Sequence, residues 1–136
     1  MSIKINPYPI QVRYVDCDMA GHVNNAIYFS YFENARVHYF GQLFGVDRDW
    51  ETEGILLRTN EIEYFSPIYL TDEPLIELYI VSIGTKSFTV GYEIRVNNEL
   101  RTIGKSVIVC FNSKEKKTYV IPEKDRYILE QLKRNL

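Results

Sequence analysis

A long, strongly apolar segment in the first third of the chain restricts the folds that this sequence can adopt. Residues 26–44 carry apolar or aromatic side chains around most of a helical circumference, and polar residues occupy only part of it. A helix that is apolar on most sides is buried rather than laid on a surface. At about 1.5 Å per residue it would be about 30 Å long, enough to cross a small domain. We therefore expect the rest of the chain to wrap around this helix.

The loop before the helix gathers groups that can take part in chemistry. A strand is predicted over residues 8–18, and the helix is expected to begin at Asn24 or Asn25, after a short loop with two carboxylates, a glycine and a histidine. Asn24 is a good N-cap, because its side chain can accept a hydrogen bond from a first-turn N–H. The other free N–H groups and the positive end of the helix dipole would face the loop. A carbonyl oxygen placed there would be polarised.

The rest of the chain is mostly strand. Residues 87–96 alternate apolar and polar side chains, the pattern of a strand with one buried and one solvent-facing side. Asn97-Asn98 predicts a tight hairpin turn, because Asn tolerates positive φ better than most residues. Further strands are predicted at residues 55–65, 75–83 and 100–111, and a short helix from Pro122. Short turns favour antiparallel pairing, so we expect an α+β domain with one antiparallel five-stranded sheet around one long helix.

Length, charge and apolar content limit the class of protein. The 136 residues are enough for one core, and we expect a single domain over residues 1–136. The formal charge of −2 gives no electrostatic case for nucleic acid as the main ligand. No apolar run approaches the ~20 residues of a membrane helix, and the first five residues lack the apolar core of a signal peptide. We expect a cytoplasmic protein with neither a nucleic-acid nor a membrane partner.

The segment from Tyr14 to Tyr28, with Asp16, Asp18, Gly21, His22, Asn24 and Asn25, resembles the front motif of hot-dog-fold acyl-CoA thioesterases of the 4-hydroxybenzoyl-CoA thioesterase-like group. Residues 58–67 look similar to that family's second strand, and residues 84–88 to its turn into the next strand pair. The resemblance covers nearly the whole chain. It implies the hot-dog fold, a sheet wrapped around a central helix, and hydrolysis of a coenzyme A thioester that needs no metal or redox cofactor.

The resemblance also implies roles for residues of the front motif. Asp18 matches the family's catalytic carboxylate, as nucleophile or general base. The backbone N–H of Asn25 matches the group that polarises the thioester carbonyl, and Tyr14 stands where some members have a site tyrosine. One branch carries a histidine where Asn25 stands, and this chain departs from that branch. The role of His22 stays open: it could orient Asp18, bond the carbonyl or lock the loop.

Asp16 has a competing interpretation. It lies two residues before Asp18, on the same face if the strand persists. We interpret it as a structural carboxylate that bonds loop N–H groups, with Asp18 as the catalytic one. A metal site built on the Asp-x-Asp pair is a weaker interpretation than a structural role, because the sequence offers no further ligands at suitable spacing.

Four residues are candidates for binding the substrate. Arg58 and Lys86 could meet the phosphates of coenzyme A, although single basic residues on strands and turns are usually solvated. Ser87 follows Lys86 in the turn that resembles the family's own. Tyr28 belongs to the core by default or lines the acyl pocket.

Partners and assembly follow from the same features. Two alternatives to acyl-CoA hydrolysis stay open: hydrolysis of an acyl carrier protein thioester, and a non-catalytic acyl-binding or scaffolding module. A five-stranded sheet leaves edge strands with unpaired N–H and C=O groups, which proteins pair or cover. Edge-to-edge pairing of two copies would bring the strand with Arg58 toward the partner's Asp18 loop. We expect a homodimer with composite sites, and the resemblance implies that two dimers can form a homotetramer.

Overall fold

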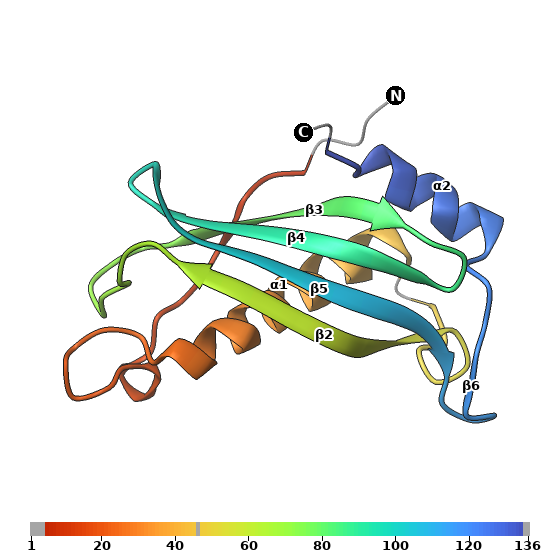
Figure 1. Cartoon of the computed structure of the whole chain (residues 1–136), viewed down its shortest axis with the longest axis horizontal. Coiled ribbons are helices and arrows are strands. Elements are labelled where there is room, and N and C mark those ends of the chain that lie inside the picture. The colour runs from red at the N-terminus through yellow and green to blue at the C-terminus, as the bar shows by residue number, and fades with distance from the viewer. Residues whose placement is uncertain (1–4, 46, 135–136) are drawn as a thin grey trace.

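The structure, a computed structural model, describes residues 5–45 and 47–134 and consists of a curled sheet with one long helix against its inner face (Figure 1). The elements are β1 (Tyr8–Pro9), α1 (Tyr28–Leu43), β2 (Gly54–Tyr64), β3 (Leu75–Ile83), β4 (Ser87–Val96), β5 (Glu99–Asn112), β6 (Lys117–Thr118) and α2 (Glu123–Gln131). Short 3-10 helices occur at residues 14–16 and 25–27. The predicted α+β class, the long helix and the short C-terminal helix are confirmed.

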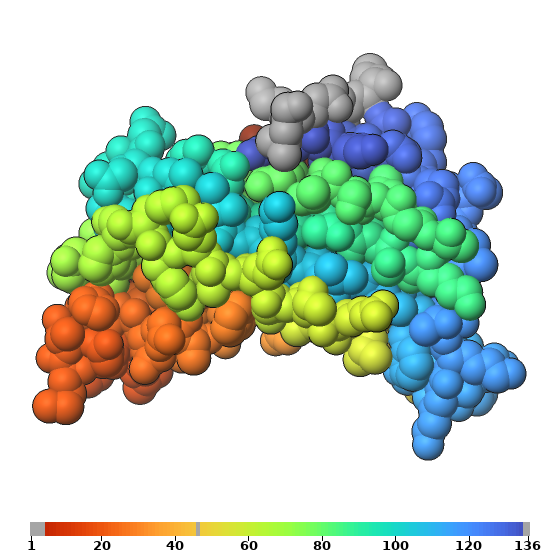
Figure 2. All heavy atoms as spheres, viewed as in Figure 1, coloured from red at the N-terminus to blue at the C-terminus, as the bar shows by residue number. Residues whose placement is uncertain are grey.

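The strands form one antiparallel sheet in the order β1-β3-β4-β5-β2, and the two-residue β6 pairs with the end of β5. Asn97 and Asn98 connect β4 to β5 with φ values of 50° and 66°, so the predicted tight turn is confirmed. β2 is the last strand on one side, and its side chains run across the lower part of the face seen in Figure 2. Among the described residues, the outer edge of β2 has no strand partner.

Aromatic side chains fill the contact between α1 and the sheet. Phe32 is fully buried, and its ring stacks on that of Tyr92 with 4.2 Å between centroids. A Cβ atom on Gly104 would lie 2.3 Å from the Phe32 ring, so this close approach of helix and strand requires glycine. The buried side of the helix consists of Tyr28, Tyr31, Phe32, Ala35, Arg36, Tyr39 and Phe40.

One side of α1 stays uncovered, contrary to the expectation that the chain wraps around the whole helix. Ser30, Glu33 and Asn34 are exposed, and Val37 is 70% exposed. These positions are three or four residues apart and therefore share one face of the helix. A single curled sheet has one concave side, so within one chain it covers only one side of the helix.

The strand predicted over residues 8–18 is wrong beyond its first two residues. β1 pairs only with the start of β3, which begins at Leu75 and offers no further partner. The chain then turns into the 3-10 helix of residues 14–16, where the Arg13 N–H and guanidinium both donate to the Asp16 carboxylate. A local turn held by a side chain therefore replaces the strand.

The C-terminal helix α2 packs beside β3, far from the start of α1 (Figure 1). A buried ion pair between Arg48 and Asp125, with nitrogen–oxygen distances of 3.0 Å, joins α2 to the segment before β2. Leu129 anchors the helix in the core. In the part of the chain that the structure describes, no helix is both long and apolar enough to cross a bilayer.

Candidate active site

The loop that holds Asp18 is a small hairpin. Its arms pair at Cys17 and Val23, and the Asp18 N–H donates to the His22 carbonyl at 3.0 Å. Gly21 closes the turn with a φ of 86°, which favours glycine, and its N–H donates to the Asp18 carbonyl at 3.1 Å. This local pairing puts the side chains of Asp18 and His22 next to each other.

Backbone hydrogen bonds fix the hairpin against the N-terminal end of the helix. The Asn24 N–H donates to the Asp16 carbonyl at 2.8 Å, and the Asn24 side chain accepts from the Ala26 N–H at 3.0 Å, as the predicted N-cap requires. The Tyr64 hydroxyl on β2 donates to the Asn25 carbonyl at 2.7 Å. First-turn N–H groups such as that of Asn25 have no partner within the helix, and the dipole there is positive. This end can therefore bind an oxygen acceptor and polarise it.

The Asp18 carboxylate is accessible and lightly bonded. Its side chain is 37% exposed, one oxygen accepts from the Ala20 N–H at 2.9 Å, and the other lies 3.8 Å from His22 Nδ1. The His22 ring lies edge-on to Tyr69, with 6.3 Å between centroids. A carboxylate with so few contacts keeps lone pairs free for water or substrate.

Asp16 has the opposite environment. Its carboxylate is fully buried and accepts from the Arg13 N–H at 3.0 Å, the Arg13 guanidinium at 3.0 Å and the Tyr31 hydroxyl at 2.8 Å. Burial acts to raise the pKa of Asp16, but these hydrogen bonds outweigh it and hold the pKa below its usual value. The expectation that Asp16 bonds loop N–H groups is confirmed. Its expected place on one strand face with Asp18 is wrong, because no strand continues there.

Asp16 and Asp18 are not joined by further side chains that could serve as metal ligands in the described part of the chain. Across residues 5–45 and 47–134, no three His, Cys, Asp or Glu side chains converge as metal ligands would.

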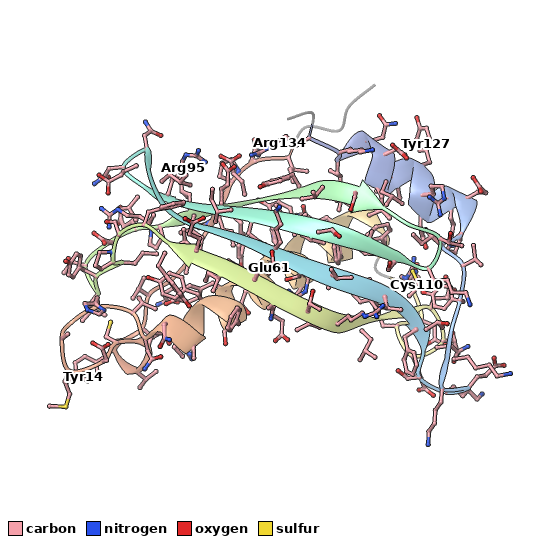
Figure 3. The ribbon with its side chains drawn as sticks, in the orientation of Figure 1. Tyr14, Glu61, Arg95, Cys110, Tyr127 and Arg134 are labelled. Atoms are coloured by element: carbon pink, nitrogen blue, oxygen red, sulfur yellow. The ribbon has the colours of Figure 1, made fainter. Side chains whose placement is uncertain are left out.

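The two tyrosines predicted for the site lie in different surroundings. Tyr14 is 82% exposed and lies at the outer side of the loop, away from the sheet (Figure 3). Tyr28 is buried at the start of α1, edge-on to Tyr64 with 4.9 Å between centroids, and burial raises its pKa. Sequence reasoning gave Tyr64 no role. Its alternation with Asn60 and Ile62 on β2 was the available signal that it faces inward.

The other predicted substrate-binding residues lie away from Asp18 within one chain. Lys86 and Ser87 are at the start of β4, at the opposite end of the sheet from Tyr64 (Figure 1). The β5 residue that pairs with Ser87 and the β5 residue that pairs with Tyr64 are seven positions apart, or about 23 Å at ~3.3 Å per residue. Arg58 is exposed at a β-bulge within β2. One chain therefore brings Asp18 together with His22, on a hairpin that is bonded to the helix start carrying Asn25 and Tyr28. Lys86, Ser87 and Arg58 lie elsewhere on the sheet.

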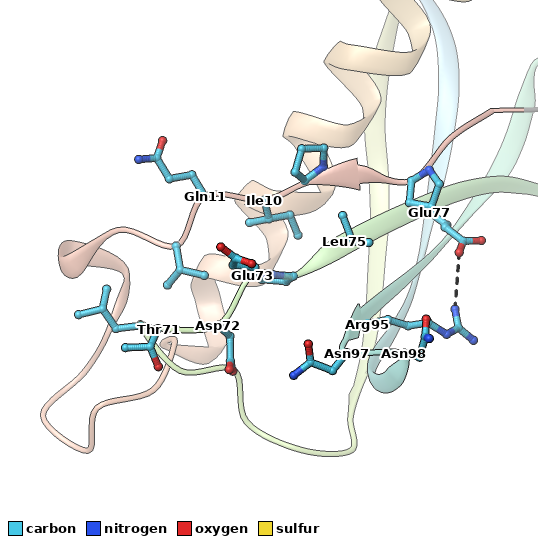
Figure 4. Close-up of a pocket in the computed structure, with 15 residues that line it drawn as sticks. Ile10, Gln11, Thr71, Asp72, Glu73, Leu75, Glu77, Arg95, Asn97 and Asn98 are labelled. Atoms are coloured by element: carbon cyan, nitrogen blue, oxygen red, sulfur yellow. Dashed lines mark ion pairs between the residues drawn. The ribbon is translucent and has the colours of Figure 1, made fainter.

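The two wide grooves considered next lie outside the loop, in the described part of the chain. The larger, about 890 Å³, runs between the N-terminal segment, residues 70–75 and the Asn97-Asn98 turn, and contains none of the predicted site residues (Figure 4). The second, about 630 Å³, runs between the uncovered side of α1 and β2. Its lining is mostly apolar: Val37, Phe40, Trp50, Ile55, Leu56, Leu57 and Ile108. The second groove is the better match for an apolar occupant.

A family model described as the Thioesterase-like superfamily matches residues 12–132 of the chain. The acyl-CoA thioester hydrolase YbgC of Escherichia coli O6:H1 is 26% identical over 129 residues, which cover 90% of this chain and 94% of that protein. The uncharacterised protein YsmA of Bacillus subtilis (strain 168) is 29% identical over 83 residues, which cover 61% of this chain and only 56% of that protein.

Solved structures are similar over almost the full length. A thioesterase complexed with coenzyme A and Zn from Thermus thermophilus is 30% identical and superposes with a TM-score of 0.81, covering 96% of each chain. The residues that the family model matches include the Asp18 loop, the long helix and the sheet from β2 to β5.

Proposed function

Because the chain belongs to the Thioesterase-like superfamily, we propose that it is an acyl-CoA thioester hydrolase, which converts a coenzyme A thioester and water into a free acid and the free thiol. One observation carries this proposal: Asp18 presents an accessible carboxylate on a hairpin that a backbone hydrogen bond joins to the start of the long helix. The name of the Escherichia coli relative and the coenzyme A in the Thermus thermophilus structure support the substrate class.

In the proposed mechanism the thioester carbonyl lies at the helix N-terminus. The Asn25 N–H donates to the carbonyl oxygen and stabilises the negative charge that develops on it. Loss of one such donor typically costs about 10²–10³ in kcat. The Ile27 N–H donates to the Asn24 carbonyl at 3.0 Å and so holds the peptide group that carries the Asn25 N–H. The Tyr64 hydroxyl and the Asn24 cap hold the next peptide group, between Asn25 and Ala26.

Asp18 acts on the carbonyl carbon by one of two routes. As a nucleophile it forms a mixed anhydride and expels the thiolate, and water then cleaves the anhydride. As a general base it takes a proton from water while the water oxygen attacks the carbon. The C–S bond then breaks, and the thiolate leaves and takes up that proton. Single turnover in ¹⁸O-labelled water tests the nucleophilic route, because label enters the Asp18 carboxylate only when water attacks the aspartyl carbon of an anhydride. His22 Nδ1, at 3.8 Å, orients Asp18 in either case.

We further propose a homodimer formed along β2, with two dimers able to form a tetramer. The free edge of β2 carries Leu56 and Leu57, 52% and 42% exposed, and an exposed apolar edge needs cover. In an antiparallel β2–β2 pairing, the end with Tyr64 meets the opposite end of the partner's sheet. Arg58, Lys86 and Ser87 of one copy would then approach the Asp18 loop of the other, where they could bind the phosphates of coenzyme A.

A turnover screen tests the proposed activity. Purified protein is given a panel of acyl-CoA thioesters that differ in chain length and in aromatic or aliphatic character, and thiol release is followed. Each acyl group is also presented on acyl carrier protein. We expect release from at least one coenzyme A thioester with kcat/KM above that of its carrier-protein counterpart. Preference for the carrier protein, or acyl-CoA binding by calorimetry without release from either, would overturn the proposal.

A further inference from the structure

Arg36 on α1 is a buried cation without a charged partner in the described part of the chain. The residue is 8% exposed, and its Nη1 donates to the Tyr92 hydroxyl at 2.8 Å. Its recorded partner is therefore a neutral oxygen, and no ion pair to Arg36 occurs among residues 5–45 and 47–134. A buried charge is costly unless an opposite charge compensates it. The single chain thus leaves this guanidinium uncompensated.

A chain of hydrogen bonds fixes the guanidinium in place. The Tyr92 hydroxyl, which accepts from Arg36, donates to Ser106 Oγ at 2.9 Å, and Ser106 donates in turn to Asn60 Oδ1 on β2. Each hydrogen bond in this series is donated in the direction away from the cation. The bonds therefore reinforce one another but supply no negative charge. Arg36 is thus held against the concave side of the sheet, and it lines the groove between α1 and β2.

The groove beside Arg36 also contains the opposite charge. Glu33 lies one helical turn before Arg36, is exposed, and lines the same 630 Å³ groove between α1 and β2. Val37 and Leu56, both more than half exposed, supply apolar surface around the two charges. Gly41, one turn further along α1, has nothing within 4 Å of where a Cβ would be. This face carries a cation, an anion and apolar surface, and it has room for a close approach.

We propose that Glu33 of each copy pairs with Arg36 of the other across the two-fold axis of the homodimer, an inference that rests on the dimer of the proposed function. Two residues three positions apart on a helix are separated by about 4.5 Å along its axis. When two such helices meet antiparallel about a two-fold axis midway between these positions, each glutamate lies opposite the partner's arginine. The face is therefore complementary to itself in charge.

Charge reversal tests the pair. Glu33→Arg gives a homodimer in which arginine faces arginine, and Arg36→Glu gives one in which glutamate faces glutamate. We expect each to raise the dimer dissociation constant at least about tenfold in sedimentation velocity. In an equimolar mixture both pairs reform within the heterodimer. Dimers should then form over the same range of protein concentration as in the wild type. Native mass spectrometry with one isotopically labelled variant should find heterodimers in excess over both homodimers.

Matched controls separate this inference from its alternatives. Glu130→Arg reverses an exposed glutamate on α2, away from the groove, and should leave association unchanged. If Arg36→Glu fails to fold by circular dichroism, the comparison of Glu33→Arg with Glu33→Gln decides: only the former should regain dimer as salt rises from about 0.05 M to 1 M. Wild-type association of Glu33→Arg, or folded variants that form no heterodimer, would overturn the pair. Thiol release by the wild-type protein is scored separately, so the hydrolase proposal stands or falls on its own measurement.

Discussion

Asp16 and Asp18 are two positions apart and have opposite surroundings. Asp16 is enclosed by the Arg13 guanidinium, a backbone N–H and the Tyr31 hydroxyl, whereas Asp18 faces solvent beside His22. Arg13 gives Asp16 three hydrogen bonds and Tyr31 a fourth, which together occupy the lone-pair sites of this carboxylate. This difference supports a structural role for Asp16 and the proposed reactive role of Asp18.

The assignment of Asp16 predicts a pH-dependent stability. The folded-state pKa of Asp16 lies below its unfolded value, so its stabilisation is present above the unfolded pKa of ~3.9 and is lost as pH falls through the folded pKa. Asp16→Asn should lower the free energy of unfolding at pH 7 by about 1–3 kcal/mol. Its stability should also fall less steeply than that of the wild type below about pH 4. Urea unfolding across pH measures both, and an unchanged unfolding free energy at pH 7 would remove the structural role.

His22 is predicted to orient Asp18 rather than to gain or lose a proton during catalysis. His22→Ala should lower kcat by less than Asp18→Asn does, because the helix N-terminus still polarises the carbonyl. The pH–rate profile should keep its shape. If the variant loses a limb near pH ~6.5 that the wild type shows, His22 itself gains or loses a proton during catalysis.

Among the elements, the start of the long helix is expected to affect both the free energy of unfolding and kcat. Asn24→Ala removes the cap on the Ala26 N–H and should cost about 1 kcal/mol of unfolding free energy. It should also lower kcat, because the first turn that carries the Asn25 N–H loses the cap that orders it. Asn24→Asp keeps a capping oxygen and serves as the control, with stability near that of the wild type. Equal unfolding free energies for Asn24→Ala and the wild type would show that the cap is not needed.

Elements with a regular side-chain pattern could be predicted from the sequence, and elements held by specific partners could not. β4 alternates along its whole length, and α1 is apolar over most of its turns, so burial alone defines both. The strand expected at residues 8–18 alternates as well, but β3 begins too late to pair with it and the Arg13–Asp16 turn takes its place. The two-residue β6 is too short to show a periodic pattern of apolar and polar side chains.

The same distinction applies to the candidate site. The loop from Cys17 to Val23 and its Asn24 cap are local in sequence, and their residue types indicate a polar site at a helix start. The bond from Tyr64 to the Asn25 carbonyl joins residues 39 positions apart, and the network from Arg36 to Asn60 crosses four elements. Such contacts depend on strand register, which the sequence pattern alone does not fix.

For the whole molecule, the positions of Asp18 and Arg58 predict a site shared between two copies. Asp18→Asn protein mixed with Arg58→Ala protein should regain activity as subunits exchange. At equal amounts, half of the dimers are heterodimers with one intact site of two, so about a quarter of wild-type activity is expected. Thiol release is measured against time after mixing, with each variant alone as the control. Sites built within single chains would give no recovery.

The proposed role of the Asp18 carboxylate in the hydrolysis can be measured as the kcat of Asp18→Asn on the best acyl-CoA substrate. The substitution keeps the shape of an exposed side chain and removes both the nucleophile and the base. We predict a loss in kcat of at least ~10²-fold, with thermal unfolding unchanged. An Asp18→Asn protein that folds normally and retains most of its turnover would contradict the account.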